Sequence, residues 1–286
     1  MSDVKELRSI ELSSFTAMIT GIGVLFSIIS AVLISIGIIA LIPNASGVII
    51  YLIPTIVVGT FMYVIYSSFS EGLFYNLLAK KLKTVAIILK DGKEIVKVST
   101  TETAMMISII ITIQFILLYL VSVFILPLLL TSVIQTLMYT GQTTIAYSLY
   151  QLLAVLSQPA TILMLIFGTF IITFVFILLG TYIYNFLAKS GRGIVLNLST
   201  ENGLTAIDSL DPLKLGIAFA IICGILSLIT GIISFISGAN FATLVGNVLG
   251  GFVGGFIEFY LFGLFYNFLA PKLGKIKIEL IDFKIN

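Results

Sequence analysis

The sequence predicts a mainly α-helical membrane protein, with six transmembrane helices and short cytoplasmic β-strands that form a small sheet or barrel. The first observation is composition. The 286 residues are 59% hydrophobic and only 10% charged, whereas soluble domains carry about 25% charged residues. The second observation is a set of six long apolar runs. The third is one phrase, built on Tyr-Asn, that ends an apolar run three times.

A membrane-spanning helix needs about 20 predominantly apolar residues. The six runs that meet this length cover residues 14–41, 52–79, 104–130, 160–188, 213–237 and 244–270. Several exceed the thickness of one bilayer, so their ends are expected to tilt or project. The longest connection, residues 131–159, is uncharged and partly amphipathic. We expect it to form a short helix that lies at the outer surface.

Charged residues indicate how the spans are oriented. Apart from Glu71 and Glu258, all of them lie in four segments, residues 1–11, 80–102, 189–214 and 272–284. The alternate connections carry no Lys, Arg, Asp or Glu. Because Lys and Arg accumulate on the cytoplasmic side, the sequence predicts a multi-pass protein of the cell membrane with both termini in the cytoplasm.

The Tyr-Asn phrase indicates an internal repeat. It reads YNLLAKKL from Tyr75, YNFLAKSG from Tyr184 and YNFLAPKL from Tyr266, and a β-branched or aliphatic segment follows each copy. We therefore expect three units of strand, span, span and strand, related by a pseudo-threefold axis. Their limits are residues 1–90, 91–199 and 200–286.

The segments after each phrase have the pattern of β-strands. KIKIELIDFKI, residues 275–285, alternates apolar and polar residues with a period of two. Asp91-Gly92 separates two apolar runs and predicts a hairpin, because both turn positions favour positive φ. Thr200-Glu-Asn-Gly predicts a second hairpin with a longer connection. Since exposed edges and lone hairpins are unfavourable, we expect six strands in a small sheet or a closed barrel, completed by the two termini.

The third unit resembles a known family. Its first span begins at Asp211-Pro212, and its second span ends with Phe265, Tyr266, Asn267, Ala270, Gly274 and Ile276. This pattern resembles a two-span membrane domain of unknown function, which occurs as single copies in small actinobacterial proteins and also in archaeal proteins. The second unit lacks the Asp-Pro pair at the start of its first span. The first unit has Thr84 at the end of the region in which the family pattern has its glycine. The resemblance implies a fold unit and a topology, but no activity.

Each phrase carries one asparagine near the end of its span, at Asn76, Asn185 and Asn267. A functional interpretation is a ring of three amides at the cytoplasmic mouth of a pore. The structural interpretation, which we favour, is an amide that bonds to a neighbouring helix or to the unpaired carbonyls of a helix end. The preceding tyrosines are expected to lie in the bilayer interface.

Two acidic residues, Glu71 and Glu258, lie inside apolar runs. At about 1.5 Å per residue they lie about 13 Å and about 20 Å from the charged ends, which places Glu258 near the middle of a core about 30 Å thick. An intramembrane carboxylate is a functional-site hypothesis by default. The two positions do not correspond in the repeat alignment, so no symmetric selectivity ring is expected. A protonated structural glutamate and a proton or cation site between repeats both stay open.

The sixth span opens with closely spaced glycines. Two sets have a spacing of four, namely Gly246, Gly250 and Gly254, and Gly251 and Gly255. Small residues at this spacing let helix backbones approach closely. We expect a tight contact inside the bundle, with a membrane-protein partner or with a second copy of the chain. Glu258, one turn beyond Gly254, is expected to face protein and not lipid.

Composition and motifs exclude several function classes. The chain has no histidine, one cysteine and no phosphate loop, catalytic triad or thiol pair. We predict no enzymatic activity, no metal or other cofactor and no nucleic-acid partner. The expected function is a non-catalytic scaffold or an accessory subunit of a membrane assembly. The alternative is a small channel or a proton or cation transporter that uses Glu71 and Glu258. Asn44 is a possible glycosylation acceptor, although a Pro-Asn turn is favoured.

Overall fold

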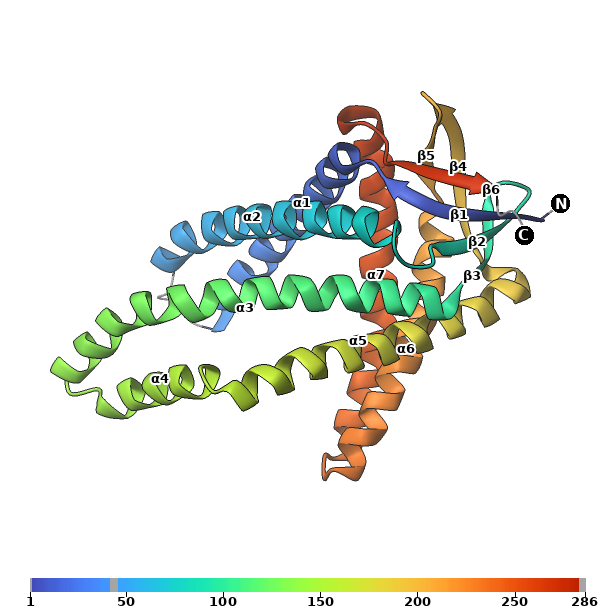
Figure 1. The fold of residues 1–286 in the computed structure, drawn as a ribbon. Coiled ribbons are helices and arrows are strands. Elements are labelled where there is room, and N and C mark those ends of the chain that lie inside the picture. Colours follow the sequence, from blue (N-terminus) through green and yellow to red (C-terminus); the bar gives the residue numbers. More distant parts are fainter. Residues whose placement is uncertain (1, 42–45, 283–286) are drawn as a thin grey trace. The chain divides into compact units, whose positions relative to one another are not determined.

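The computed structural model describes residues 2–41 and 46–282 (Figure 1). Asn44, the possible glycosylation acceptor, lies outside the described residues. Within them, six helices are long and apolar enough to cross a membrane. These are α1 (Leu12–Leu41), α2 (Ser46–Leu78), α3 (Thr100–Tyr139), α5 (Pro159–Leu187), α6 (Pro212–Ile236) and α7 (Phe241–Leu273). They match the six predicted runs.

The long uncharged connection is helical over most of its length. Helix α3 continues through Pro127 to Tyr139, although proline removes one helical hydrogen bond. The expected short helix is α4 (Thr143–Leu156), which follows after a turn. Helix α3 is therefore longer than the apolar run that predicted it.

Six strands form a closed antiparallel barrel in chain order. They are β1 (Ser2–Ile10), β2 (Val85–Lys90), β3 (Glu94–Val98), β4 (Ile194–Glu201), β5 (Leu204–Leu210) and β6 (Lys277–Asp282). The ring closes because β1 pairs with β2 on one side and with β6 on the other. The closed arrangement with pairing terminal strands is therefore confirmed. The structure assigns the barrel to neither side of a membrane.

Two tight turns connect neighbouring strands. Asp91 and Gly92 have φ values of 52° and 66°, the positive values that the hairpin prediction requires. Asn202 and Gly203 also have positive φ, 52° and 80°. Because these two residues turn the chain by themselves, β4 extends to Glu201. The connection that we predicted to be longer is thus a two-residue turn.

The chain divides into two compact units. One contains Met1–Thr103 and Leu178–Asn286, and the other contains Ala104–Ile177. The first unit holds the barrel, the pairs α1/α2 and α6/α7, and short ends of α3 and α5. The second holds α4 and most of α3 and α5. This division differs from the three segments 1–90, 91–199 and 200–286, which stay a prediction.

The core of the first unit lies where helix ends meet the barrel. One buried cluster joins α1, α7 and the segment before β6, and it contains Met18, Ile22, Tyr266, Leu269, Ala270 and Ile276. A second cluster joins the end of α5 to α6, and it contains Tyr184, Leu187, Ala188 and Ile222. Two tyrosines of the repeated phrase, Tyr184 and Tyr266, thus lie in these clusters, and the third, Tyr75, is buried as well.

Candidate functional site

Three tyrosines at helix ends hold those helices to the barrel. Each hydroxyl donates a 2.6 Å hydrogen bond to a strand carbonyl, Tyr75 to Leu7, Tyr184 to Ile95 and Tyr266 to Ile207. Each of these carbonyls lies three residues before the end of its strand. The tyrosines are 6%, 6% and 1% exposed. The strand backbone thus satisfies each hydroxyl in a buried position, and the place of these tyrosines in the bilayer interface stays a prediction.

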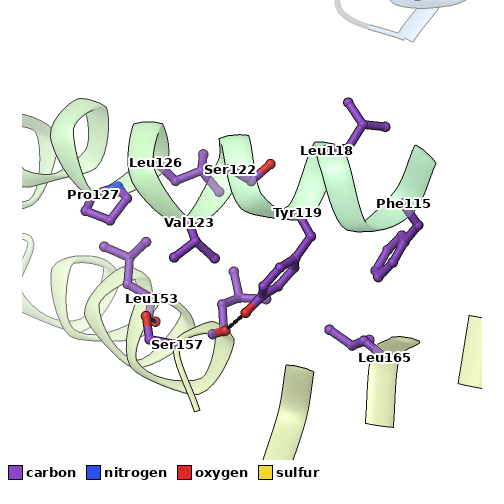
Figure 2. Close-up of a pocket in the computed structure, with 11 residues that line it drawn as sticks. Phe115, Leu118, Tyr119, Ser122, Val123, Leu126, Pro127, Leu153, Ser157 and Leu165 are labelled. Atoms are coloured by element: carbon purple, nitrogen blue, oxygen red, sulfur yellow. Dashed lines mark hydrogen bonds between the residues drawn. The ribbon is translucent and has the colours of Figure 1, made fainter. Parts of the chain in front are cut away.

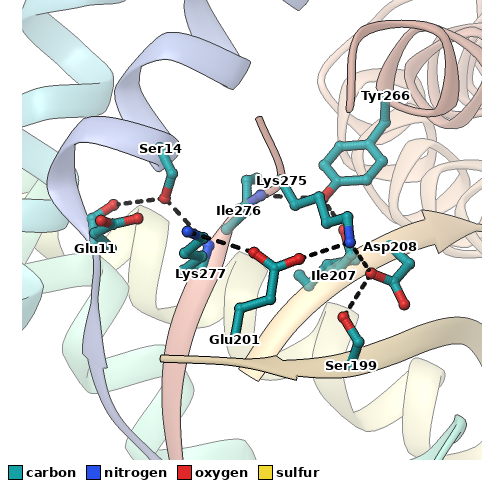
Figure 3. A network of polar contacts seen from close by, with 10 residues as sticks. All are labelled: Glu11, Ser14, Ser199, Glu201, Ile207, Asp208, Tyr266, Lys275, Ile276 and Lys277. Carbon is teal, nitrogen blue, oxygen red and sulfur yellow. Dashed lines mark hydrogen bonds and ion pairs between the residues drawn. The ribbon is translucent and has the colours of Figure 1, made fainter. Parts of the chain in front are cut away.

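Tyr266 shows how the hydroxyl completes a ladder of strand hydrogen bonds (Figure 3). The N–H of Ile207 donates directly to the carbonyl of Ile276 at 3.0 Å. The reciprocal bond passes through the phenol. The N–H of Ile276 donates to the hydroxyl at 3.2 Å, and the hydroxyl donates to the carbonyl of Ile207. Tyr184 receives the N–H of Ile194 in the same way at 3.1 Å. A phenylalanine would leave both backbone groups unpaired.

The neighbouring asparagines bind the last residue of a strand. Each side-chain oxygen accepts the backbone N–H of that residue, and each side-chain nitrogen donates to its carbonyl. The pairs are Asn76 with Ile10, Asn185 with Val98 and Asn267 with Leu210, with all six distances at 2.8 Å. An amide can do this because it carries both a donor and an acceptor.

These contacts bear on the two interpretations of the asparagines. The amide groups are bonded to backbone, whereas a pore ring would need them to line a path for solute. The structural interpretation named a neighbouring helix or a helix end as the partner, and the structure gives the end of a strand instead. A sequence signal for this existed. Tyr75, Tyr184 and Tyr266 each lie ten residues before the residue whose backbone bonds to the hydroxyl. These residues are Val85 and Ile194, which begin strands, and Ile276, which directly precedes β6.

Two glycines of the phrase allow a close approach of helices. A methyl group at Gly72 would lie 2.8 Å from a side-chain carbon of Leu12, and one at Gly263 would lie 2.9 Å from the Cα of Pro212. Leu12 and Pro212 are the first residues of α1 and α6. Glycine therefore lets the second helix of each pair cross the start of the first.

The glycines of α7 divide between two faces of the helix. A methyl group at Gly255 would lie 2.8 Å from the Cβ of Cys223, and one at Gly251 would overlap with Ser227, so both glycines pack against α6. Gly246, Gly250 and Gly254 have nothing within 4 Å of such a methyl group. For these three, the expected contact inside the bundle is absent from the described residues. A contact with a partner or a second copy stays a prediction.

The two intramembrane acids lie on different helices. Glu71 is half-buried on α2, directly before Gly72, whereas Glu258 is exposed on α7. Our expectation that Glu258 faces protein is not met within the described chain. The reason is that α7 turns Gly251 and Gly255 toward α6, which leaves Glu258 on an open face with Gly254. Among residues 2–41 and 46–282, no three His, Cys, Asp or Glu side chains are grouped as a metal site.

Sequence reasoning missed a charged network on the barrel (Figure 3). The ammonium group of Lys275 lies 2.7 Å from a carboxylate oxygen of Glu201 and 2.7 Å from one of Asp208. Lys277 lies 3.4 Å from Glu201, and the hydroxyl of Ser199 donates to Asp208. Hydrogen bonds from Lys275 lower the pKa of both carboxyl groups and raise the pKa of Lys275 itself. The network joins β4 and β5 to the chain that enters β6.

The second unit contains an apolar pocket of about 380 Å³ between α3, α4 and α5 (Figure 2). The hydroxyl of Tyr119 donates to the carbonyl of Leu156 at its edge. Ser122 and Ser157 are the other polar side chains, and the remaining lining is apolar. No charged side chain lines this pocket, so its residues offer apolar contact and not acid–base chemistry.

No protein-family model, curated protein or solved structure matches the chain. The resemblance of the third unit to a two-span membrane domain therefore stays a prediction.

Proposed function

We propose that this protein is a non-catalytic, multi-pass membrane protein that acts as a scaffold or as an accessory subunit of a membrane assembly. The main support for the proposal is that the recurring polar residues make structural hydrogen bonds. The three tyrosines and three asparagines of the repeated phrase are all bonded to strand backbone. They join helices to the barrel, and none of these six side chains is left free for chemistry.

We further propose that the chain consists of three pseudo-threefold repeats. Equivalent tyrosine and asparagine contacts at three strand ends support this arrangement. A third set of contacts supports it as well. The residue just after β1, β3 and β5 donates its backbone N–H to a carbonyl of a neighbouring strand, and that strand follows a different helix pair. The pairs are Glu11 with Lys277, Ser99 with Ala86 and Asp211 with Val195.

The charge distribution supports an orientation with both termini in the cytoplasm. Apart from Glu71 and Glu258, the charged residues lie at the termini and between helix pairs, and none lies in the connections within pairs. Lys and Arg near spans favour the cytoplasmic side. This proposal makes the cell membrane the site of action.

The open face of α7 is the proposed docking site for a membrane partner. Gly246, Gly250 and Gly254 leave room for a second helix backbone. Exposed Val253 and Ile257 supply apolar surface on the same helix. Helix packing against such a face needs no catalytic group, which fits a scaffold.

Glu258 favours a second candidate, a proton or cation transporter. Its carboxyl group is exposed on an apolar helix, and a charge at the centre of a bilayer costs at least about 2–3 kcal/mol. A partner that covers this group, a glutamate that stays protonated, and a group that exchanges protons or cations are three ways to meet this cost. The two candidates therefore predict different results in the same preparation.

The test is extraction in mild detergent, affinity purification and mass spectrometry. We expect a stable membrane partner with the wild-type chain, and its loss in the double variant Gly250→Leu and Gly254→Leu. Gly59→Leu is the matched control, because a methyl group at Gly59 also meets open space. The transporter hypothesis would be favoured over the scaffold hypothesis by two results together. The chain would be recovered without a partner, and it would conduct protons or cations in liposomes in a manner changed by Glu258→Gln.

A further inference from the structure

A groove of about 810 Å³ lies between α1, α2 and α7, within the first unit. Its floor is α1, from Leu12 to Leu25. One wall is formed by Phe61, Ile65 and Phe69 of α2, and the other by leucines of α7. The volume lies in the range of about 300–1,000 Å³ that is typical of ligand sites.

The sequence explains why this groove exists. Helix α1 carries small side chains along the floor, at Ser13, Thr16, Ala17, Thr20 and Gly21. The α2 residues that line the wall recur every four positions, so they lie along one face of that helix. Small residues opposite large ones leave a channel that runs along α1. Thirteen residue steps of α helix make this channel about 20 Å long.

Two hydroxyl groups in this apolar groove lack a partner. The side-chain oxygens of Thr16 and Thr20 are buried and make no hydrogen bond within the described residues. Thr20 is only 7% exposed. Elsewhere in the chain, threonine hydroxyls on helices bond to a carbonyl one turn back, as Thr112 and Thr169 do. Both residues line the groove, so a change of the χ1 rotamer is enough to aim either hydroxyl into it.

A positive charge lies in the last turn of α7, the helix whose leucines form one wall of the groove. Lys272 adjoins Leu273, which lines the wall beside Gly21. Its ammonium group lies 3.3 Å from the ring centroid of Phe268 and is exposed. The acidic residue nearest in sequence to the floor is Glu11. It precedes Leu12, at the end of the floor away from Gly21 and Leu273. A cation one residue from the lining residue Leu273 and an unpaired donor at Thr20 are thus the polar features on which a ligand of this groove could draw.

We propose that this groove binds an anionic glycerophospholipid. One acyl chain lies along the channel, because helices that cross a membrane are surrounded by acyl chains and the channel is apolar. The ester carbonyl accepts a hydrogen bond from Thr20, with Thr16 one turn away. The phosphate lies toward Lys272. This inference is independent of the partner proposed for α7.

The test uses the absence of tryptophan from the chain. Phe69→Trp places a single reporter in the groove wall, and Phe235→Trp places one at an exposed position of α6. Each protein is reconstituted into vesicles of phosphatidylcholine that contain increasing fractions of brominated phosphatidylglycerol, whose bromines quench tryptophan. We expect the groove reporter to prefer the brominated anionic lipid about tenfold over phosphatidylcholine, and the α6 reporter to show no preference.

Two substitutions in the Phe69→Trp background locate the contacts. We expect Thr20→Val to weaken lipid binding about fivefold, in line with the loss of one hydrogen bond, and Lys272→Gln to remove the preference for the anionic lipid. Thr230→Val is the matched control, because that hydroxyl already bonds to carbonyls of its own helix. Equal quenching at both reporters, or equal effects of Thr20→Val and Thr230→Val in folded protein, would overturn the proposal. Ala17→Leu, which fills the channel, provides a second variant if Thr20→Val does not fold.

Discussion

At the scale of single residues, the polar groups of the helix ends serve the barrel. A tyrosine hydroxyl bridges two strands, and an asparagine amide binds both backbone groups of a strand end. Each of these backbone groups would cost free energy if it were buried without a partner. The repeated Tyr-Asn pair therefore keeps short strands paired where they meet helices.

The first prediction concerns Tyr266, the most buried of the three tyrosines at 1% exposure. Tyr266→Phe keeps the ring but leaves the N–H of Ile276 and the carbonyl of Ile207 unpaired. We expect a loss of about 1–3 kcal/mol in the free energy of unfolding, measured by thermal or denaturant unfolding in detergent. Tyr182→Phe is the control, since Tyr182 is 70% exposed. Equal losses in the two variants would contradict the role of the hydroxyl.

The partners of these residues could not be predicted from the sequence. Tyr266 and Ile207 are 59 positions apart, and Tyr184 and Ile95 are 89 positions apart. Apolar periodicity locates a helix end, but it does not say which distant strand that end meets. The likeness of the three phrases indicated that their residues play equal roles. The hydrogen-bond partners of those residues could be identified only from the register of the strands.

At the scale of elements, the sequence predicts strands and helices better than it predicts helix faces. Six apolar runs and the Asp91-Gly92 turn each correspond to an observed element. The glycines of α7 show the limit. Their spacing of four defines two faces, and only the positions of Cys223 and Ser227 on α6 decide which face packs inside the chain.

The second prediction tests this division of faces. Gly255→Val forces side-chain atoms into Cys223 and the carbonyl of Phe219, whose atoms lie 2.8 Å and 3.1 Å from the added Cβ. We expect a loss of about 1–3 kcal/mol in the free energy of unfolding, as for overpacked cores. Gly254→Val, one position away on the open face, should leave the unfolding of the isolated chain almost unchanged. A larger effect at Gly254 than at Gly255 would reverse the assignment of the faces.

The third prediction concerns pH and the charged network between β4, β5 and β6. Hydrogen bonds from Lys275 lower the pKa of Glu201 and Asp208 in the folded state, whereas in the unfolded chain these groups titrate near pH 4. A lowered folded pKa gives stability that is present above the unfolded pKa and is lost as pH falls through the folded value. We therefore expect the unfolding temperature to fall below about pH 4.

Lys275→Gln provides the matched measurement for the network. The variant should unfold at a lower temperature than the wild type at pH 7, and the difference should shrink as the pH falls below about 4. Lys189→Gln, at an exposed lysine outside this network, should show a constant difference or none. A Lys275→Gln effect that does not change with pH would show that the network does not act through these carboxyl groups.

At the scale of the whole molecule, the barrel and the proposed membrane topology constrain each other. Strands β1 and β6 come from the two ends of the chain and pair with each other, so both termini must lie on one side of any membrane that the helices cross. The hairpin turns at 91–93 and 202–203 belong to the same barrel. The proposed topology expects the turns within helix pairs, such as 140–142, on the other side.

The last prediction tests that orientation with single cysteines. In a Cys223→Ser background, Asn202→Cys lies in the β4–β5 turn and Gly141→Cys lies in the turn between α3 and α4. Positive residues accumulate on the cytoplasmic side, so a membrane-impermeant maleimide added to intact cells should label position 141 and not position 202. Both should react after the membrane is permeabilised. Labelling of position 202 alone would invert the topology, and labelling of both in intact cells would mean that the helices between them do not separate the two turns by a bilayer.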